Sequence, residues 1–300
     1  MNPVRNTEKG INGIPGVPAG EFLMTSSDFQ QIAAMLHADA GIHLSESKAT
    51  LVYSRLAKRL RALGLKNFRD YCAIVAEHGG ADERQQMLAA LTTNVTRFFR
   101  EPHHFEHLRK QVLPALVETA KRGGRVRLWS AACSNGAEPY SIALTVLSVL
   151  PTAQSYDIKV LATDIDPNMV EEGSSGIYSD TALQPVPSDL RLRYFTASRS
   201  AEGKTWQAGE ALRSLITFRE LNLIGAWPMR GKFDAIFCRN VVIYFEDATQ
   251  ARLWSRFVPH LMPGGRLYIG HSERLSGPAA PLFENEAITT YRLKEGTQKK

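Results

Sequence analysis

Four short stretches of this sequence could bind a ligand, and the first is 130–141, which reads SAACSNGAEPYS. Small side chains let the backbone approach a ligand closely, and Glu138 adds a carboxylate at an expected helix start. The stretch lacks the GxGxxG pattern of dinucleotide-binding turns, and it lacks the GxxxxGKS pattern that a P-loop nucleotide triphosphatase needs. A tight strand-to-helix turn without any ligand is the alternative.

The second stretch reads ATDID and contains Asp164 and Asp166. An acidic residue after the second strand of an open α/β sheet can accept hydrogen bonds from both hydroxyls of a ribose. Capping of the next helix is an equally simple role for Asp164, and Asp166 before Pro167 suits that role. The pattern therefore predicts either a nucleoside contact or a helix cap.

The third stretch contains Arg239, Asn240 and Tyr244, and it follows an apolar strand expected over 233–238. Loop residues at the carboxyl end of a central strand commonly face the reacting group. The fourth stretch, 94–102, has two adjacent phenylalanines between arginines and is expected to form a lid or a domain joint. A plain interdomain linker is the alternative there.

Two other patterns suggest chemistry that we do not expect. His103 and His107 are four residues apart, but HHFEH is not the HExxH zinc motif and no further ligand is evident, so no metal is expected. Cys133 lies near a helix start, where a thiol can become a nucleophile. No histidine is placed beside it by the pattern, so we expect a small structural cysteine.

The elements that position these stretches follow from hydrophobic spacing. Apolar residues at helical spacing predict a small helical domain over 22–92, followed by a linker at 93–104. Strands alternating with helices over 105–293 predict a mostly parallel sheet that is covered on both faces. Candidate strands near Trp206 and at 215–218 break that rhythm and predict a small β insertion at about 176–221. Residues 1–21 and 294–300 are expected to be tails, the first of them disordered.

Composition limits the class of protein. The 300 residues are 44% hydrophobic and 22% charged, as in ordinary soluble proteins, and no run of 18 apolar residues suggests a membrane span. Three cysteines without a CxxC pair favour a reduced cytoplasm. The net charge of +6 suggests an acidic partner, which could be nucleic acid, anionic lipid or an acidic protein surface.

Basic residues are concentrated on one expected helix, at Arg55, Lys58, Arg59 and Arg61. They mostly avoid the apolar stripe of that helix. They therefore form either a solvated face or a surface for an acidic partner.

In their order and spacing, five runs resemble the chemoreceptor glutamate methyltransferase (CheR) family: NVTRFFREPHHF, LWSAACSNGAEPYSIA, LATDID followed by SGIY, FDAIFCRNVVIYF and PGGRLYIGHSE. The resemblance covers about residues 24–293. One departure is Ala137–Glu138, where the family often has two acidic residues. The resemblance implies a helical N-terminal domain before a Rossmann-like α/β methyltransferase domain with an inserted β subdomain.

The same resemblance implies S-adenosylmethionine (SAM) as cofactor, which leaves as S-adenosylhomocysteine. It implies a cytoplasmic enzyme of bacterial chemotaxis that methylates glutamate side chains on the acidic cytoplasmic helices of chemoreceptors. The helix with Arg55, Lys58, Arg59 and Arg61 would then bind those helices. Arg100 and Tyr244 match positions near the transferred methyl group. The residues that match cofactor-contacting positions are Asn94, Thr96, Arg100, Glu138, Asp164, Asn222, Leu223, Arg239 and Asn240.

Two other functions stay open. A nucleic-acid methyltransferase would need a pocket for a flipped base with aromatic stacking, and RNVVIYF offers only Tyr244 and Phe245, so no nucleic-acid partner is expected. A non-catalytic SAM-binding adaptor would lack Arg100, Asp164 or Tyr244, and the chain has all three. The resemblance does not decide whether the β insertion binds a peptide at the receptor C-terminus, as it does in some members.

Overall fold

The computed structural model describes residues 21–77, 79–200 and 203–296. The chain divides into two compact units, Met1–Thr93 and Asn94–Lys300. Of the expected tails at 1–21 and 294–300, residues 1–20 and 297–300 lie outside the described residues. Glu21, the last residue of the expected N-terminal tail, pairs with Arg61 of the first unit at 2.7 Å.

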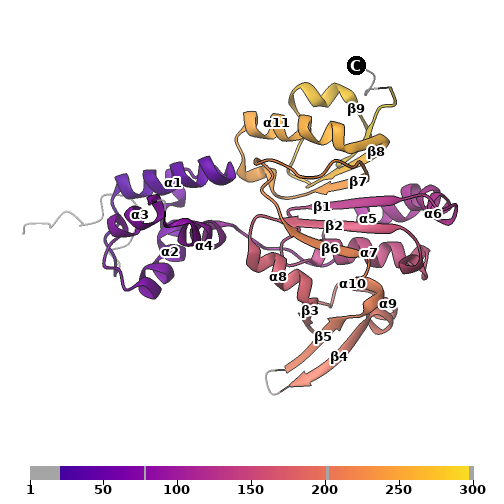
Figure 1. The fold of residues 1–300 in the computed structure, drawn as a ribbon, viewed down its shortest axis with the longest axis horizontal. Coiled ribbons are helices and arrows are strands. Elements are labelled where there is room, and N and C mark those ends of the chain that lie inside the picture. Colours follow the sequence, from indigo (N-terminus) through magenta and orange to yellow (C-terminus); the bar gives the residue numbers. More distant parts are fainter. Residues whose placement is uncertain (1–20, 78, 201–202, 297–300) are drawn as a thin grey trace, which may run out of the picture. The chain divides into compact units, whose positions relative to one another are not determined.

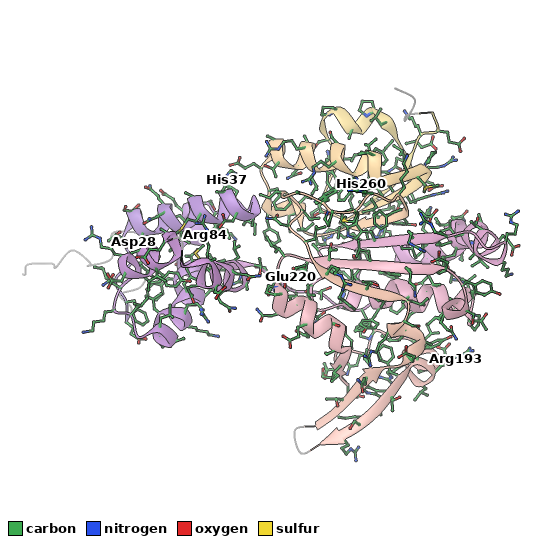
Figure 2. The ribbon with its side chains drawn as sticks, in the orientation of Figure 1. Asp28, His37, Arg84, Arg193, Glu220 and His260 are labelled. Carbon is green, nitrogen blue, oxygen red and sulfur yellow. The ribbon has the colours of Figure 1, made fainter. Side chains whose placement is uncertain are left out.

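The first unit is helical, as the apolar spacing predicts (Figure 1). Thr25 and Asp28 form a capping box at the start of its first helix, and Gly41 ends that helix in the left-handed conformation with φ of 71°. Arg84, labelled in Figure 2, pairs with Asp39. The helices are α1 (Ser26–Ala40), η1 (Glu46–Lys48, 3-10), α2 (Ala49–Leu63), α3 (Phe68–Ala76) and α4 (Ala81–Leu91).

The second unit is built on a seven-stranded sheet with the order β6-β2-β1-β7-β8-β10-β9. Neighbouring strands are parallel from β6 to β8, and β10 is antiparallel to both β8 and β9. This confirms the mostly parallel sheet. The strands are β1 (Val126–Ala131), β2 (Ile158–Asp164), β6 (Ile216–Glu220), β7 (Phe233–Cys238), β8 (Leu261–Ile269), β9 (Phe283–Ala287) and β10 (Thr290–Leu293).

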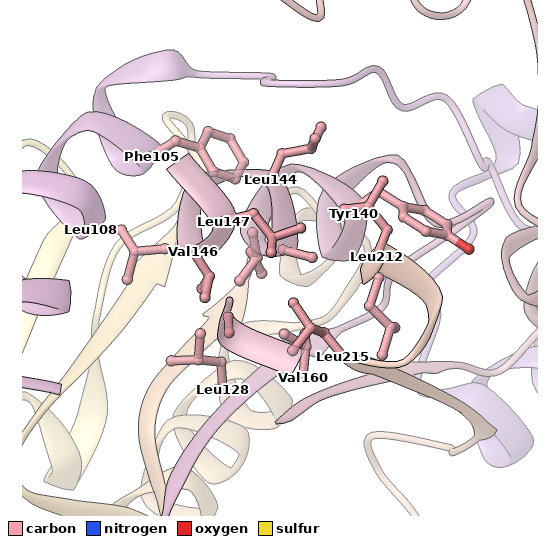
Figure 3. Packing of buried hydrophobic residues seen from close by; sticks show 14 of the residues in the cluster. Phe105, Leu108, Leu128, Tyr140, Leu144, Val146, Leu147, Val160, Leu212 and Leu215 are labelled. Atoms are coloured by element: carbon pink, nitrogen blue, oxygen red, sulfur yellow. The ribbon is translucent and has the colours of Figure 1, made fainter. Parts of the chain in front are cut away.

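Helices cover both faces of this sheet. Leu128 of β1 packs in one buried cluster with Leu144 and Leu147, whereas the next residue of the strand, Trp129, contacts Phe257 with ring centroids 5.4 Å apart (Figure 3). Successive strand residues point to opposite faces, so α7 and α11 lie on opposite sides. The helices are α5 (Pro102–His107), η2 (Leu108–Val112, π), α6 (Leu113–Lys121), α7 (Ala137–Val149), η3 (Ala153–Ser155), α8 (Pro167–Ser175), α9 (Ser188–Tyr194), α10 (Glu210–Arg213), η4 (Val242–Tyr244), α11 (Asp247–Phe257), η5 (Val258–His260) and η6 (Gly277–Leu282).

A second, three-stranded antiparallel sheet projects from this unit (Figure 1). Its order is β3-β5-β4, with β3 (Ile177–Ser179), β4 (Phe195–Ser200) and β5 (Gly203–Ala208). The sequence places residues 215–218 in this insertion, but residues 216–218 belong to β6, the edge strand of the main sheet. The reason is parallel pairing with β2, which runs from Val160↔Ile216 to Asp164↔Glu220. A short apolar run does not reveal which sheet it will join.

The stretch 94–101 also differs from the expected linker, because it belongs to the compact second unit. The backbone N–H of Phe99 donates to Ser141 Oγ of α7 at 2.9 Å, and the Phe98 ring packs edge-on against Tyr178 at 4.9 Å. The α5 helix then begins at Pro102. No helix in the described part of the chain is long and apolar enough to cross a membrane.

Candidate active site

Most of the predicted site residues of the second unit lie at the carboxyl ends of four neighbouring parallel strands. Glu138 follows β1, Asp164 ends β2, Asn222 and Leu223 follow β6, and Arg239 follows β7. Carboxyl ends of parallel strands meet at one edge of a sheet, and ligands of open α/β folds bind there. The topology therefore brings these residues to a single edge.

The turn after β1 approaches its neighbours very closely. Ala132, Ser134 and Gly136 all have positive φ, of 66°, 50° and 89°. A Cβ on Gly136 would lie 2.7 Å from the Tyr178 hydroxyl oxygen, so this position needs glycine. The result is a turn of small residues whose backbone faces the end of β2, where the Ser134 N–H donates to Asp164 Oδ2 at 2.7 Å.

Asp164 is buried, with 6% of its surface exposed. Its second carboxylate oxygen accepts a hydrogen bond from the Asp166 N–H at 3.0 Å. Burial raises the pKa of Asp164 to about 6, although these N–H donors oppose the rise. Asp166 is the residue that caps α8, through the Asn168 N–H. The capping role that the sequence left open thus belongs to Asp166.

Asn94 joins this group from a distant part of the chain. Its side-chain Nδ2 donates to Asp166 Oδ2 at 2.8 Å, and its carbonyl accepts a hydrogen bond from Ser134 Oγ at 2.9 Å. Thr96 lies in the same irregular stretch. Arg100 braces this stretch, since its Nη1 donates to the Val95 carbonyl at 3.0 Å.

Glu138 and Arg239 form a buried ion pair at 2.7 Å. Ser130 Oγ donates to the other oxygen of Glu138 at 2.7 Å. Arg239 Nη2 lies 3.4 Å from Glu101 Oε2 and donates to the Arg100 carbonyl. Both terminal nitrogens of the Arg239 guanidinium thus bind protein groups, while its buried Nε has no hydrogen-bond partner among the described residues. The guanidinium holds two carboxylates and the 94–101 stretch in place.

The sequence interpretation missed Glu101. Burial raises its pKa, but Arg239 and hydrogen bonds from His271 and Asn240 outweigh burial and hold the pKa at about 2. The Asn240 Nδ2 donates to Glu101 Oε1 at 3.2 Å. Glu101 therefore links the loop after β7 to the stretch before α5. Its position beside Arg100 in sequence was the only available signal.

The loop after β6 is held in place by a side chain of α11. Arg256 of α11 donates to the carbonyls of Leu223 and Gly225 at 2.7 and 2.5 Å, and its guanidinium lies 4.0 Å from the Trp227 ring centroid. Leu223 is buried, and the Asn222 side chain accepts a hydrogen bond from the Ile224 N–H. Nothing local in the sequence marks Arg256 as a support for this loop.

Tyr244 closes the loop after β7, as the last residue of η4, and it is half-buried. Asn240 starts that loop in the left-handed region with φ of 59°. Both predicted residues therefore stand on one short, tightly folded segment beyond the end of β7.

Among the described residues, one group of side chains could hold a metal ion, and it consists of Glu101 and the two histidines that follow it. Ligand atoms of Glu101, His103 and His104 lie within 4.8 Å of one another. Burial, followed by the charge of Arg239, lowers the pKa of His104 to about 3, and the same guanidinium repels a cation. The absence of a metal stays a prediction. Burial raises the pKa of the Cys133 thiol far above its ordinary value, which suits an inert cysteine.

Three of the four predicted basic residues of α2 have partners inside the first unit. Arg55 Nη1 donates to the carbonyls of Leu91 and Thr92 at 2.9 and 2.6 Å, at the end of α4. Arg59 makes a two-pronged pair with Glu83 at 2.9 and 2.5 Å. Arg61 pairs with Glu21, and Lys58 is exposed. Arg55 and Arg59 therefore hold the helices together, so the expectation of an entirely solvated or docking face does not fit them.

Comparison with known families matches both units. The profile of the "CheR methyltransferase, all-alpha domain" covers residues 27–92, and that of the "CheR methyltransferase, SAM binding domain" covers residues 94–292. The chain belongs to the CheR methyltransferase family. It is a SAM-dependent methyltransferase with the helical domain and the Rossmann-like sheet that the sequence predicted.

Curated CheR proteins are similar over most of their length. A "Probable chemotaxis protein methyltransferase" of Rhizobium etli is 55% identical over 86% of this chain and 96% of its own. "Chemotaxis protein methyltransferase 2" of Pseudomonas aeruginosa is 43% identical, covering 84% of this chain and 88% of its own. The Escherichia coli "Chemotaxis protein methyltransferase" is 40% identical, covering 84% and 86%.

The residues at the strand ends fit SAM. The turn after β1 is made of small residues, and the Asp164 carboxylate lies beside it. A small-residue turn next to an acidic residue at the end of the second strand is the arrangement that binds nucleoside cofactors in open α/β folds. Glu101 and Glu138 share the Arg239 guanidinium, which fixes the carboxyl end of β7 beside that of β1.

The buried state of Asp164 predicts a pH-dependent affinity. We expect S-adenosylhomocysteine to bind more weakly as the pH falls through about 6, because the ionised carboxylate is the better acceptor for the ribose hydroxyls. Calorimetry between pH 5 and pH 8 measures this step. The Asp164→Asn variant should bind about 10- to 150-fold more weakly at pH 8, since a hydrogen bond to a charged group contributes about 1.5–3 kcal/mol. The affinity of this variant should not change near pH 6. If the affinity of Asp164→Asn still falls near pH 6, another titrating group causes the pH dependence.

Proposed function

We propose that this CheR protein methylates the side-chain carboxylates of glutamates on the cytoplasmic helices of chemoreceptors, and that it does so in the cytoplasm. The observation that carries the proposal is near full-length similarity to proteins named chemotaxis protein methyltransferase, together with the presence of Arg100, Asp164 and Tyr244. These three residues also argue against a non-catalytic SAM-binding adaptor. The product is a glutamate methyl ester, used for adaptation in chemotaxis.

The proposed reaction needs no general base. When bound, SAM supplies a methyl group on a positively charged sulfur, so that an O–CH₃ bond forms on the glutamate while the CH₃–S bond breaks and its electron pair stays on sulfur. A substrate glutamate, with an ordinary pKa of about 4.3, is already ionised at neutral pH. The residues of this chain therefore bind, orient and exclude water, and orientation alone can supply about 7–11 kcal/mol of the barrier.

Each site residue has a proposed part in that orientation. Asp164 binds the ribose of SAM, and the loop with Asn222 and Leu223 contacts the rest of its nucleoside. Arg239, with Glu138, fixes the framework. Arg100 and Tyr244 are the proposed catalytic residues, since each can donate a hydrogen bond to the reacting carboxylate from beside the methyl group. That donation accelerates transfer only where it is stronger in the transition state than in the ground state.

The proposed partner surface follows the charges of the helical unit. Receptor methylation helices are acidic, and Lys58 and Arg61 are the basic residues of the predicted set that α2 exposes. A second proposed contact is a receptor C-terminal peptide on the β subdomain. The outer strands β3 and β4 can accept an added strand, and Arg193 of α9, labelled in Figure 2, adds positive charge to this subdomain.

A transfer assay tests the proposal. The protein is incubated with methyl-labelled SAM and receptor-bearing membranes, with DNA and RNA in parallel tubes. We expect label on the receptor that mild base releases as methanol, as a carboxyl methyl ester requires. A receptor whose methylation-site glutamates are changed to alanine is the control. Label on nucleic acid, or SAM binding without any transfer, would overturn the proposal in favour of a different methyltransferase or an adaptor.

Charge reversal on α2 should separate docking from folding. We expect Lys58→Glu to slow receptor methylation several-fold at low ionic strength while S-adenosylhomocysteine affinity stays unchanged, because an exposed charge steers association and is screened over about 8–10 Å. Arg59→Glu should instead destabilise the helical unit, since it places a second carboxylate against Glu83. Initial rates and thermal midpoints measure the two effects. Normal methylation by folded Lys58→Glu at low salt would show that α2 is not the docking face.

A further inference from the structure

Glu273 lies in the turn after β8, next to the loop that carries Asn240 and Tyr244. It belongs to the run GHSE, which begins at Gly270. Only 4% of its surface is exposed, so its carboxylate is almost completely removed from water. A buried carboxylate is costly unless protein groups satisfy it.

The carboxylate of Glu273 accepts hydrogen bonds from four backbone N–H groups. Oε1 accepts from Val241 at 2.9 Å and from Val242 at 3.0 Å. Oε2 accepts from Asn240 at 3.0 Å and from Gly270 at 2.5 Å. Three of these donors are consecutive residues of the loop after β7. A single side chain thus fixes the backbone of that loop from the neighbouring strand's turn.

The surrounding backbone leaves little freedom for another arrangement. A Cβ on Gly270 would lie 2.4 Å from Asn240 Nδ2 and 2.9 Å from Glu273 Oε2. Asn240 itself has φ of 59°, a left-handed conformation that costs free energy for a residue with a side chain. The Glu273 carboxylate offsets that cost, because its four hydrogen bonds are available only when the loop takes this path.

The four N–H donors around the Glu273 side chain need an acceptor on both of its terminal atoms, which a carboxylate provides and an amide does not. Burial raises the pKa of Glu273 above its ordinary value, and the four N–H groups oppose the rise. Each oxygen faces two N–H donors, so an amide at this position would turn an NH₂ group against N–H groups of the loop. Glutamine is nearly the same size as glutamate, so it changes the donors and acceptors while keeping the volume.

We infer that Glu273 is a positioning residue for methyl transfer: it holds the backbone of residues 240–242 and thereby sets Tyr244 at the reacting methyl group. Loss of this anchor lowers kcat by letting Tyr244 move, although Glu273 itself touches neither cofactor nor substrate. The inference rests on the proposed function only where kcat is measured. The anchoring of the loop by Glu273 can be measured without any enzymatic activity.

Hydrogen exchange measures the anchoring directly. In the wild type, the amides of Asn240, Val241 and Val242 should be protected; in Glu273→Gln their exchange should be at least 10-fold faster, with protection of β1 and β2 unchanged. Glu286→Gln is the matched control. It makes the same change at a carboxylate on β9 that pairs with Arg266, and it should leave the 240–242 amides protected. Unchanged exchange in Glu273→Gln would overturn the inference.

Kinetics test the link to Tyr244. We expect Glu273→Gln to lower kcat about 10- to 100-fold, with S-adenosylhomocysteine affinity within about 5-fold of wild type, and we expect Glu286→Gln to leave both unchanged. In a Tyr244→Phe background the same substitution should lower kcat less than 3-fold, because the group that Glu273 positions is already absent. Equal losses in both backgrounds, or wild-type kcat in Glu273→Gln, would show that Glu273 does not act through Tyr244.

A further variant, Glu273→Asp, keeps the inference testable if Glu273→Gln does not fold. Glu273→Asp keeps the carboxylate but shortens its reach by one methylene, so part of the anchoring should return, with kcat and amide protection between those of Glu273→Gln and wild type. If Glu273→Gln unfolds, the aspartate variant must show faster exchange at 240–242 than elsewhere in the sheet; uniform exchange would overturn the inference. A wild type that fails to methylate receptors yet shows the exchange pattern would contradict the proposed function and leave the anchor established.

Discussion

An Arg239→Met variant is expected to unfold with a free energy about 3–5 kcal/mol lower than that of the wild type. The guanidinium is 2% exposed and faces Glu138 at 2.7 Å and Glu101 at 3.4 Å. Methionine fills similar volume but leaves the buried Glu138 carboxylate without a positive partner and removes the arginine that faces Glu101. Urea denaturation followed by circular dichroism measures the change.

Arg109→Met is the matched control for that experiment, since Arg109 pairs with Glu106 at 3.0 Å where both side chains are about half exposed. Surface pairs contribute little, so its unfolding midpoint should stay at the wild-type value. If Arg239→Met shifted the midpoint no more than Arg109→Met, the buried cluster of Arg239, Glu138 and Glu101 would not stabilise the sheet edge as argued.

Tyr244→Phe is expected to lower kcat about 10- to 150-fold while S-adenosylhomocysteine affinity stays within about 2-fold of wild type. The substitution removes only a hydroxyl, and Tyr244 ends a short 3-10 helix whose backbone is held independently of that hydroxyl. The proposed hydrogen bond to the reacting carboxylate should therefore be lost without change to the cofactor site. Steady-state kinetics with saturating SAM measure kcat.

Tyr291→Phe is a control for Tyr244→Phe, since Tyr291 lies on β10 in the antiparallel part of the sheet. It should leave kcat unchanged. A Tyr244→Phe enzyme with wild-type kcat and a raised KM would show that Tyr244 contributes to ground-state binding of the receptor. The proposed catalytic role would then be wrong.

Much of the fold was readable from local patterns. Hydrophobic spacing predicted the helical unit and the parallel core strands, because side-chain period and burial are properties of short segments. The strand over 233–238 was predicted with the bounds that the structure has. Residues 216–220 could not be assigned in this way. Their place beside β2 depends on a partner that is more than fifty residues away in the chain.

The sequence by itself determined the family, the sheet, and the presence of the residues proposed for SAM and methyl transfer, since most of those residues stand at strand ends wherever the strands form. Only the tertiary structure decided which charges are free to act. Arg55 and Arg59 bind groups of α4 and its C-terminal end. Arg239 pairs with two carboxylates, and Glu273 accepts hydrogen bonds from the N–H groups of the loop after β7. Each of these pairings joins residues distant in sequence. Hydrogen bonds and ion pairs depend on separations of a few ångströms in space, which the spacing of residues along the chain does not specify.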